Sequence, residues 1–496
     1  MGEVQAWLFE PQFNRAVKVR DTDERITSDA GVLLLREADH RLGLTESLAK
    51  KLLDPRDPKK IRYDAVELLR ERLYAMAIGY STQDDADRLA HDPAFKLAVW
   101  NRPGEQVLEE RLASQPTQSR LLDMLAASTN REELREALAD WSHRHLRAGG
   151  DYAARHVTID IDSFPVEVFG HQPGAKYNGY YRETMYHPLV ASYCTAGDYD
   201  AMQHGYRLGN GFVHATLRAG NVHTGDGLKR FLLETLRKTE DLGYVRDVRI
   251  DAGLVEGPVL DLLTREKMRF IGRIKSNPVL ERLAEPHVSR PVGRPPEGGY
   301  EYTVELGMYQ AESWEHAQRL VLCVVDRPDA NGQLNLSPNY FFLIVGWQPG
   351  ELPADAALAH YRKRGTFEDR IGEFNQVIGP SLSSPTFEEN EVTLLLSLLA
   401  FNLANLLRLE FEDDAGACWD LGRFQRDVLK AGARVTKGAR RLIVSVAKAV
   451  TPFWIRVTAR IAAWRLPACF GQPRGAYAHA WTPPPDHAFL EDIRRC

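Results

Sequence analysis

The stretch from residue 156 to residue 277 limits the possible folds most strongly, because β-rich runs and amphipathic helical segments alternate along it. Three strand-like runs come first, and two helical segments then alternate with two more strands. We predict strands at 156–164, 186–194, 203–211, 245–253 and 269–277, and helices at 226–243 and 255–267. This β-β-β-α-β-α-β order predicts an α/β fold with a mixed sheet flanked by helices.

The flanking regions have other patterns. Helical periodicity dominates the first 150 residues, and three strand-like runs and a Pro/Gly-rich turn lie between 279 and 350. After a helical segment at 360–376 we predict helices at 390–411 and 439–464. The predicted regions are a helical N-terminal region (1–150), the first part of the core (151–278), a β-rich insertion (279–350), the last core helix (351–385) and a helical basic C-terminal region (386–496).

Net charge is distributed unevenly along the chain. The whole chain carries −5, but residues 423–465 contain eleven Lys or Arg residues and a single acid. This segment therefore carries +10 and the rest of the chain −15. A basic stripe of this kind suits a phosphate backbone, and Arg434, Lys437, Arg440 and Arg441 are its central candidates. A solvated helical surface is the alternative interpretation.

Cysteines and apolar runs indicate the compartment. The five cysteines include no CxxC pair and none lies near a histidine pair at zinc spacing, so we expect neither a structural zinc nor a disulfide framework. The apolar run near residue 392 is interrupted by Asn402 and Asn405, which makes it a poor membrane span. We therefore expect a cytoplasmic protein without a signal peptide.

Acidic residues occur at the ends of the predicted strands. Asp160 and Asp162 are two residues apart on one strand, so their side chains share a face. Asp251 follows another apolar strand, just before a glycine turn. Strand ends in α/β sheets are common places for active sites. Each aspartate alone fits a turn-capping or surface role equally well, and their similar context favours a site.

HYRKRGTFEDRIGEFNQ, at 360–376, predicts one helix with a polar face. At 100° per residue, Tyr361, Arg364, Glu368 and Asn375 share this face, whereas the apolar stripe points elsewhere. Carboxylates from separate elements suit Mg²⁺, with Mn²⁺ as its substitute. Arg364 could bind a phosphate through its guanidinium and Tyr361 through its hydroxyl. An ordinary amphipathic helix with a solvated face is the alternative.

GHQPGAKYNGYYR, at 170–182, interleaves aromatic and basic residues. Lys176 and Arg182 could contact DNA, while the tyrosines between them could stack on unpaired bases. A buried tyrosine cluster fits the same pattern.

With these residues in place, the sequence resembles the DDE transposases of bacterial insertion sequences, DDE-domain group 1, of the insertion sequence 1380 family. Tyr361-x2-Arg364-x3-Glu368 is similar to the signature around the last acid of related transposases. Similar stretches are TSDAGVLLLRE at 27, GYSTQDDADRLAHDPAFKLA at 79, LASQPTQSR at 112, the segment from IDIDSF to YHPL, and RIDAGL. The resemblance covers most of residues 20–460.

The resemblance implies an RNase H-like core and a transposase that binds inverted repeats in double-stranded DNA as a homodimer. It also implies that Asp162, Asp251 and Glu368 are the catalytic acids and hold Mg²⁺. The first acid could map to Asp160 or Asp162, and the position nearer the strand end favours Asp162. Relatives often have a lysine where this chain has Asn375, so the cationic contact to DNA is either missing here or supplied by Arg370 or another residue. A nuclease of the same fold without strand transfer, or a catalytically silent DNA-binding protein, is the rival hypothesis.

Overall fold

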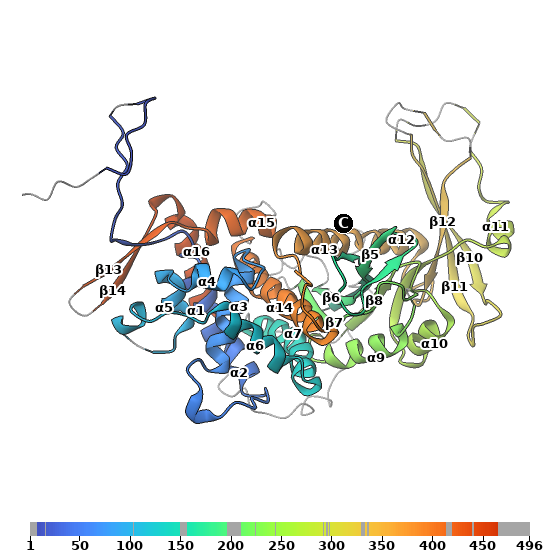
Figure 1. The fold of residues 1–496 in the computed structure, drawn as a ribbon. Helices are drawn as coiled ribbons and strands as arrows, with labels where there is room; N and C mark the ends of the chain where they lie inside the picture. Colours follow the sequence, from blue (N-terminus) through green and yellow to red (C-terminus); the bar gives the residue numbers. More distant parts are fainter. Residues whose placement is uncertain are drawn as a thin grey trace, which may run out of the picture.

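The computed structural model describes residues 7–464, apart from 15, 103, 149–155, 196–209, 224, 244, 291, 294, 295, 297, 329–332, 335, 336, 413–418, 439 and 440. Figure 1 shows a helical body, built from both ends of the chain, beside a large sheet built from its middle.

The large sheet has eight strands in the order β10-β11-β12-β9-β8-β2-β6-β7. Its strands are β2 (His156–Ser163), β6 (Leu189–Thr195), β7 (Asn210–Thr216), β8 (Val245–Ile250), β9 (Arg269–Ile274), β10 (Tyr300–Tyr309), β11 (Gln318–Asp326) and β12 (Tyr340–Val345). β8 pairs in parallel with β2 and β9, and the other pairs are antiparallel. The prediction of a mixed sheet flanked by helices is confirmed. β10, β11 and β12, from the Pro/Gly-rich region onward, extend one edge of this same sheet.

Helices cover both faces of the sheet (Figure 1). They are α9 (Leu228–Lys238), α10 (Gly257–Arg265), α11 (Pro278–Ala284), α12 (Ala354–Arg362) and α13 (Gly365–Val377). Alternate residues of β2, Val157, Ile159 and Ile161, pack in one core with α9 and α10. α12 packs in a separate core against the opposite face, where Leu343 and Val345 of β12 point. The two-residue period therefore sends the aspartates of β2 toward the α12 side.

The helical body joins segments that are distant in the sequence. Its N-terminal helices are α1 (Val32–Leu42), α2 (Leu44–Ala49), α3 (Ala65–Ala77), α4 (Asp85–Leu89), α5 (Pro93–Val99), α6 (Gln115–Leu125) and α7 (Ser128–Ala148). From the C-terminal side come α14 (Phe387–Glu412), α15 (Leu421–Phe424) and α16 (Thr451–Ala462). One continuous hydrophobic core includes residues from both sets.

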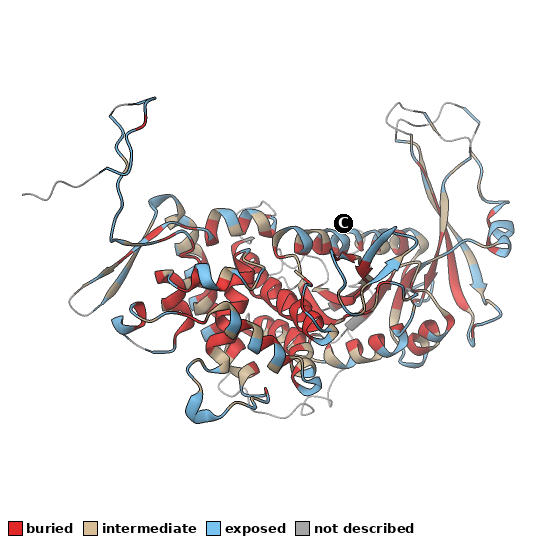
Figure 2. Cartoon of the chain, in the orientation of Figure 1, coloured by how far each residue is buried: buried red, intermediate tan, exposed pale blue. Residues whose placement is uncertain are grey.

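α14 is the central helix of this body, and Figure 2 shows it buried along most of its length. Residues 387–411 are long and apolar enough to cross a membrane, but the whole apolar window is buried inside the protein. Asn402 accepts a hydrogen bond from the Phe212 N–H of β7 and donates one to its carbonyl. These features are those of a core helix of a folded domain, in which polar side chains bond the adjacent sheet edge.

Two small sheets complete the fold. One contains β3 (Val166–Glu167), β5 (Glu183–Tyr186) and β4 (Lys176–Asn178), and the other contains β1 (Arg25–Thr27), β13 (Ala433–Lys437) and β14 (Leu442–Val446). The predicted helix at 439–464 is therefore wrong in its first part, where β14 forms a hairpin with β13. β13 gains a partner in β1, and its alternate residues Ala433 and Val435 are buried. That pairing favours strand over helix.

Candidate active site

Asp162 occupies the end of β2 on the α12 side. Its backbone neighbour Ser163 donates an N–H bond of 2.8 Å to Asp162 Oδ1, and 17% of the Asp162 side chain is exposed. Asp251 follows β8 directly, and the Leu254 N–H donates to its carbonyl in a tight turn. Because β2 and β8 run parallel and adjacent, their carboxyl ends bring these two acids to the same edge.

α12 and α13 are separate helices, so the predicted single helix at 360–376 is wrong. α12 ends at Arg362 and α13 begins at Gly365. At the junction the Arg364 N–H donates to the Tyr361 carbonyl and the Phe367 N–H to the Arg364 carbonyl, both at 2.9 Å. These i→i+3 bonds tighten the turn, and Gly365, a weak helix former, marks the bend. The break places Arg364 in the N-cap position of α13, one turn before Glu368.

Arg364 connects the three predicted acids. Its guanidinium forms ion pairs with Asp162 and Glu368, and its Nη1 lies 3.7 Å from Asp251 Oδ1. Only 7% of the Arg364 side chain is exposed, compared with 41% for Asp251 and 59% for Glu368. Three acids from three distant segments therefore meet around one buried positive charge.

The electrostatics of Asp162 follow from this crowding. Burial raises the pKa of its carboxyl to about 6, Arg364 opposes the rise, and the charges of Asp251 and Glu368 add to it. The same charges act on Tyr361, whose pKa burial raises to about 12. Tyr361 is half-buried, and its ring packs against the core beneath α12, 6.4 Å from the ring of Phe341.

Asp160 lies apart from this cluster. Both oxygens of its carboxylate accept hydrogen bonds of 2.7 Å from Arg249 of β8, and the two side chains are almost completely buried. Arg249 is the residue that the sequence analysis missed, since only the β2–β8 register shows that residue 249 lies opposite residue 160. The structure brings together Asp162, Asp251, Glu368 and Arg364, and leaves Asp160 outside.

The other predicted DNA-contacting residues lie outside the cluster of acids. Asn375 is exposed on α13, two turns beyond Glu368. Arg370, considered above as a substitute for the missing lysine, is buried and donates to the Ser192 hydroxyl at 3.0 Å. A cation directed at DNA from Arg370 is therefore excluded by its burial. Lys176 and Arg182 are exposed on the small sheet of β3, β4 and β5.

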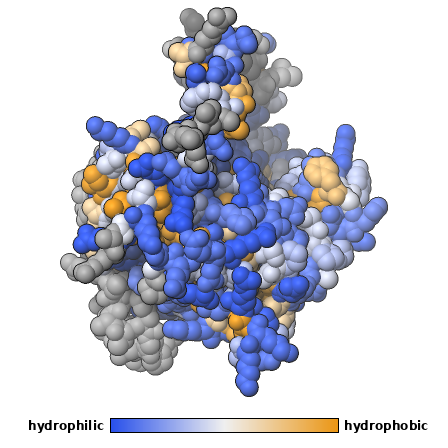
Figure 3. All heavy atoms as spheres, turned by 60° about the vertical axis from the view of Figure 1, so that its left-hand side comes forward, coloured by the Kyte–Doolittle hydropathy of each residue, from blue (hydrophilic) through white to orange (hydrophobic). Residues whose placement is uncertain are grey.

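Arg434 and Lys437, central residues of the basic stripe, lie on β13 of the β13–β14 hairpin, at the end of the molecule away from the large sheet (Figure 1). Figure 3 shows this end as a mainly hydrophilic surface. Arg434 pairs with Glu24 at 2.9 Å and Lys437 pairs with Glu105 at 2.5 Å, so acids of the N-terminal region neutralise part of the stripe. Arg441 is exposed, and Arg440 lies outside the described residues.

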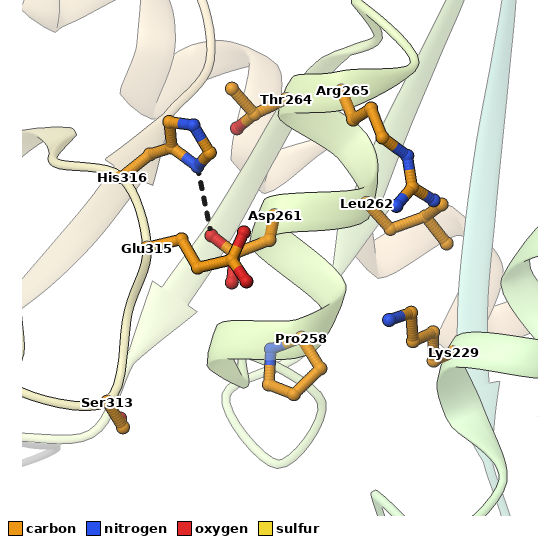
Figure 4. Close-up of a pocket in the computed structure, with 9 residues that line it drawn as sticks. All are labelled: Lys229, Pro258, Asp261, Leu262, Thr264, Arg265, Ser313, Glu315 and His316. Carbon is orange, nitrogen blue, oxygen red and sulfur yellow. Dashed lines mark hydrogen bonds and ion pairs between the residues drawn. The ribbon is translucent and has the colours of Figure 1, made fainter.

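A pocket of about 410 Å³ lies beside α10, on the face of the large sheet opposite to α12 and the acids (Figure 4). Figure 4 shows Glu315 and His316 directed toward Asp261, with His316 Nδ1 3.3 Å from an Asp261 oxygen. The side-chain ligand atoms of these three residues lie within 4.8 Å of one another. This cluster shares no residue with Asp162, Asp251 and Glu368, and its acids were not among the predicted site residues.

The acids around Arg364 have the chemistry of a divalent-cation site. Carboxylate oxygens are the ligands that Mg²⁺ and Mn²⁺ prefer, and three like charges require a cation between them. A guanidinium supplies that positive charge here. Its Nε is buried and has no acceptor among the described residues, so the side chain is not fully satisfied in this position. The donor set therefore fits divalent metal ions.

Comparisons with known proteins identify the family of the chain. The family model described as transposase DDE domain group 1 matches residues 9–464. A solved structure described as a cryo-EM structure of the piggyBac transposase synaptic complex with hairpin DNA is similar to 80% of this chain and 78% of its own, with a TM-score of 0.42 and 12% identity. No curated protein matches the sequence.

Proposed function

The chain belongs to the transposase DDE domain group 1 family, and we propose that it binds the inverted repeats of its own insertion sequence, cleaves the DNA ends and joins their 3′-hydroxyls to target DNA. The observation that carries this proposal is the meeting of Asp162, Asp251 and Glu368 around Arg364. The core would be RNase H-like, and the element would belong to the insertion sequence 1380 family, as the motifs imply.

Asp162, Asp251 and Glu368 would hold two Mg²⁺ ions, for which Mn²⁺ substitutes. When bound, such ions activate a water or a 3′-hydroxyl and stabilise the leaving oxygen of a phosphodiester. Once released from the acids, the Arg364 guanidinium would donate hydrogen bonds to the phosphate beside the scissile bond. Tyr361, whose carbonyl accepts the Arg364 N–H, would direct its hydroxyl toward the same phosphate.

Bound DNA would contact two separate surfaces, one near the acids and one at the β13–β14 hairpin. Near the acids, Lys176, Arg182 and Asn375 would contact the cleaved strand. At the far end, the β13–β14 hairpin with Arg434, Lys437, Arg440 and Arg441 would bind the phosphate backbone, and the N-terminal helical region would contribute end recognition. A homodimer follows from the need to hold two ends at once. In this proposal the five regions predicted from the sequence, 1–150, 151–278, 279–350, 351–385 and 386–496, act as functional units.

Metal binding tests the site without knowledge of the DNA ends. We expect calorimetry to detect Mn²⁺ binding by the wild-type protein and a weakening of more than about tenfold in Glu368→Gln. Asp369→Asn is the matched control, because Asp369 is the exposed neighbour on the same helix. Equal binding by all three proteins, or none by the wild type in the presence of DNA, would contradict the proposed site.

Strand transfer separates the proposed function from its rivals. Wild-type protein with cognate ends should yield joined products, and Asp251→Ala should abolish them while end binding remains. Cleaved but unjoined DNA from the wild type would indicate a nuclease. Binding without any cleavage would indicate a silent DNA-binding protein.

A further inference from the structure

Four aromatic side chains on β4 and in the segments beside β3 and β5 are exposed. Phe169, Tyr177 and Tyr180 are 83%, 62% and 87% exposed, and Tyr181 is 36% exposed. The alternative of a buried tyrosine cluster is therefore excluded for these residues, although Tyr186 of the same sheet is buried. Large aromatic surfaces left in water at one place mark a contact site more often than a folding requirement.

A rigid turn holds the two tyrosines at its tip. Asn178 Oδ1 accepts hydrogen bonds from the N–H groups of Tyr180 and Tyr181, and the Arg182 N–H donates to the Asn178 carbonyl at 2.7 Å. Asn178 Nδ2 anchors the turn by donating to the Gly220 carbonyl. Arg182 adopts a left-handed φ of 62°, a conformation that costs energy for a residue with a Cβ. The turn thus presents its aromatic rings in a fixed position.

The turn lies near two of the three acids, Asp162 and Asp251. The Tyr181 ring is 5.8 Å from the His187 ring, and His187 precedes Leu189, which pairs with Ser163 next to Asp162. Burial raises the pKa of the Tyr181 hydroxyl, and the charges of Tyr180, Asp162 and Asp251 add to the rise. Exposed cations, Lys176 and Arg182, flank the aromatic pair. A strand of DNA cleaved at the acids would pass these rings.

We propose that the exposed ring of Tyr180, which stands at 84° to the Tyr181 ring with the centroids 5.0 Å apart, forms a stacking platform for an unpaired nucleobase next to the cleaved phosphodiester. This inference rests on the proposed function, because the ligand is the DNA strand held at the acids. Aromatic rings flanked by cations suit single-stranded nucleic acid, since every base offers a π-face and the cations attract its backbone. The platform would hold DNA that is opened at the element end, independently of base identity.

The test compares two duplexes of the same generic sequence, one blunt and one with a short single-stranded overhang. Binding is measured by fluorescence anisotropy in EDTA, where cleavage cannot occur. Wild type should prefer the overhang, and Tyr180→Ala with Tyr181→Ala should lower overhang affinity by about tenfold without changing blunt-duplex affinity. Tyr180→Trp should keep the preference. Met308→Ala is the control, because Met308 is 67% exposed on β10, at the outer edge of the large sheet.

A second readout identifies stacking directly. A 2-aminopurine base in the overhang should lose fluorescence on binding wild type and Tyr180→Trp, but not the double alanine variant. The platform would be overturned if wild type showed no overhang preference, or if the double alanine variant lost equal affinity for both duplexes. Neither result would contradict the proposed metal binding and strand transfer. Failure of Mn²⁺ binding in the separate calorimetric test would instead overturn the proposed function.

Discussion

Asp160 and Arg249 form a buried ion pair with two hydrogen bonds of 2.7 Å, whereas Asp162, two residues further along β2, faces Arg364. The two aspartates share a face of the strand and still have different partners. Asp160 is compensated by a fixed cation inside the sheet layer. Asp162 shares its cation with two other acids at the strand end, which is the arrangement of an adaptable site.

The two aspartates should therefore respond differently to the same substitution. Asp160→Asn leaves Arg249 buried without a counter-charge, and we expect the free energy of unfolding to fall by about 3–5 kcal/mol. Asp162→Asn removes a crowded carboxylate, so stability should change little while Mn²⁺ binding is lost. Urea unfolding and calorimetry of both variants provide the measurements. Loss of Mn²⁺ binding in a stable Asp160→Asn protein would reverse the assignment.

Arg364 should compete with metal ions for the acids. Without metal, Arg364→Ala leaves three carboxylates facing one another, and we expect a destabilisation of about 3 kcal/mol. Mn²⁺ should then raise the melting temperature of this variant more than that of the wild type, because no guanidinium has to be displaced. Arg362→Ala, which breaks an exposed ion pair with Glu301, is the control. An equal Mn²⁺-induced shift in all three proteins would show that Arg364 does not occupy the cation position.

Asn402 should be essential for the contact between α14 and β7. Asn402→Leu leaves the N–H and the carbonyl of Phe212 without their partner, so stability should fall by about 2–4 kcal/mol despite the gain in apolar surface. Ser397→Ala is the control, since its hydroxyl bonds only the Thr393 carbonyl of its own helix. Thermal unfolding distinguishes the two variants. A stable Asn402→Leu protein would mean that α14 is held by apolar packing alone.

Glu71 should make stability depend on pH. Burial raises the pKa of its carboxyl to about 8, from an ordinary value of 4.5. Between these values the folded protein keeps a proton that the unfolded chain releases, so stability should fall as pH rises, by up to about 1.4 kcal/mol per pH unit. Glu71→Gln should flatten the slope and stabilise the protein at neutral pH. Urea unfolding at pH 5, 6, 7 and 8 measures it, and unchanged slopes would refute the assignment.

The β13–β14 hairpin should contribute to DNA affinity through Arg441. Arg441→Ala should reduce the slope of log affinity against log salt concentration by about 1, equally for all DNA sequences. Arg434→Ala should have a smaller effect, because Glu24 already neutralises Arg434. Filter binding over a range of salt concentrations tests both. Unaltered slopes would remove the hairpin from the DNA-binding surface.

Much of the core could be predicted because its signals are local. Strand period, helix period and the acids at strand ends are all visible in short stretches of β2, β8 and the 360–376 segment. The bend at Arg364 was missed, since helical periodicity continues through it and the i→i+3 bonds leave no trace in side-chain pattern. The β13–β14 hairpin was missed because its partner β1 lies about 400 residues away. The Asp160–Arg249 pair required the strand register.

The joining of the first and last segments in one core has a consequence for synthesis of the protein. α1 to α7 leave the ribosome early, but α14 and α16, which complete their core, follow only after residue 387. The third acid, Glu368, also comes late. A nascent chain that ends before Phe387 therefore lacks a closed helical body, and one that ends before Glu368 lacks the third of the clustered acids as well.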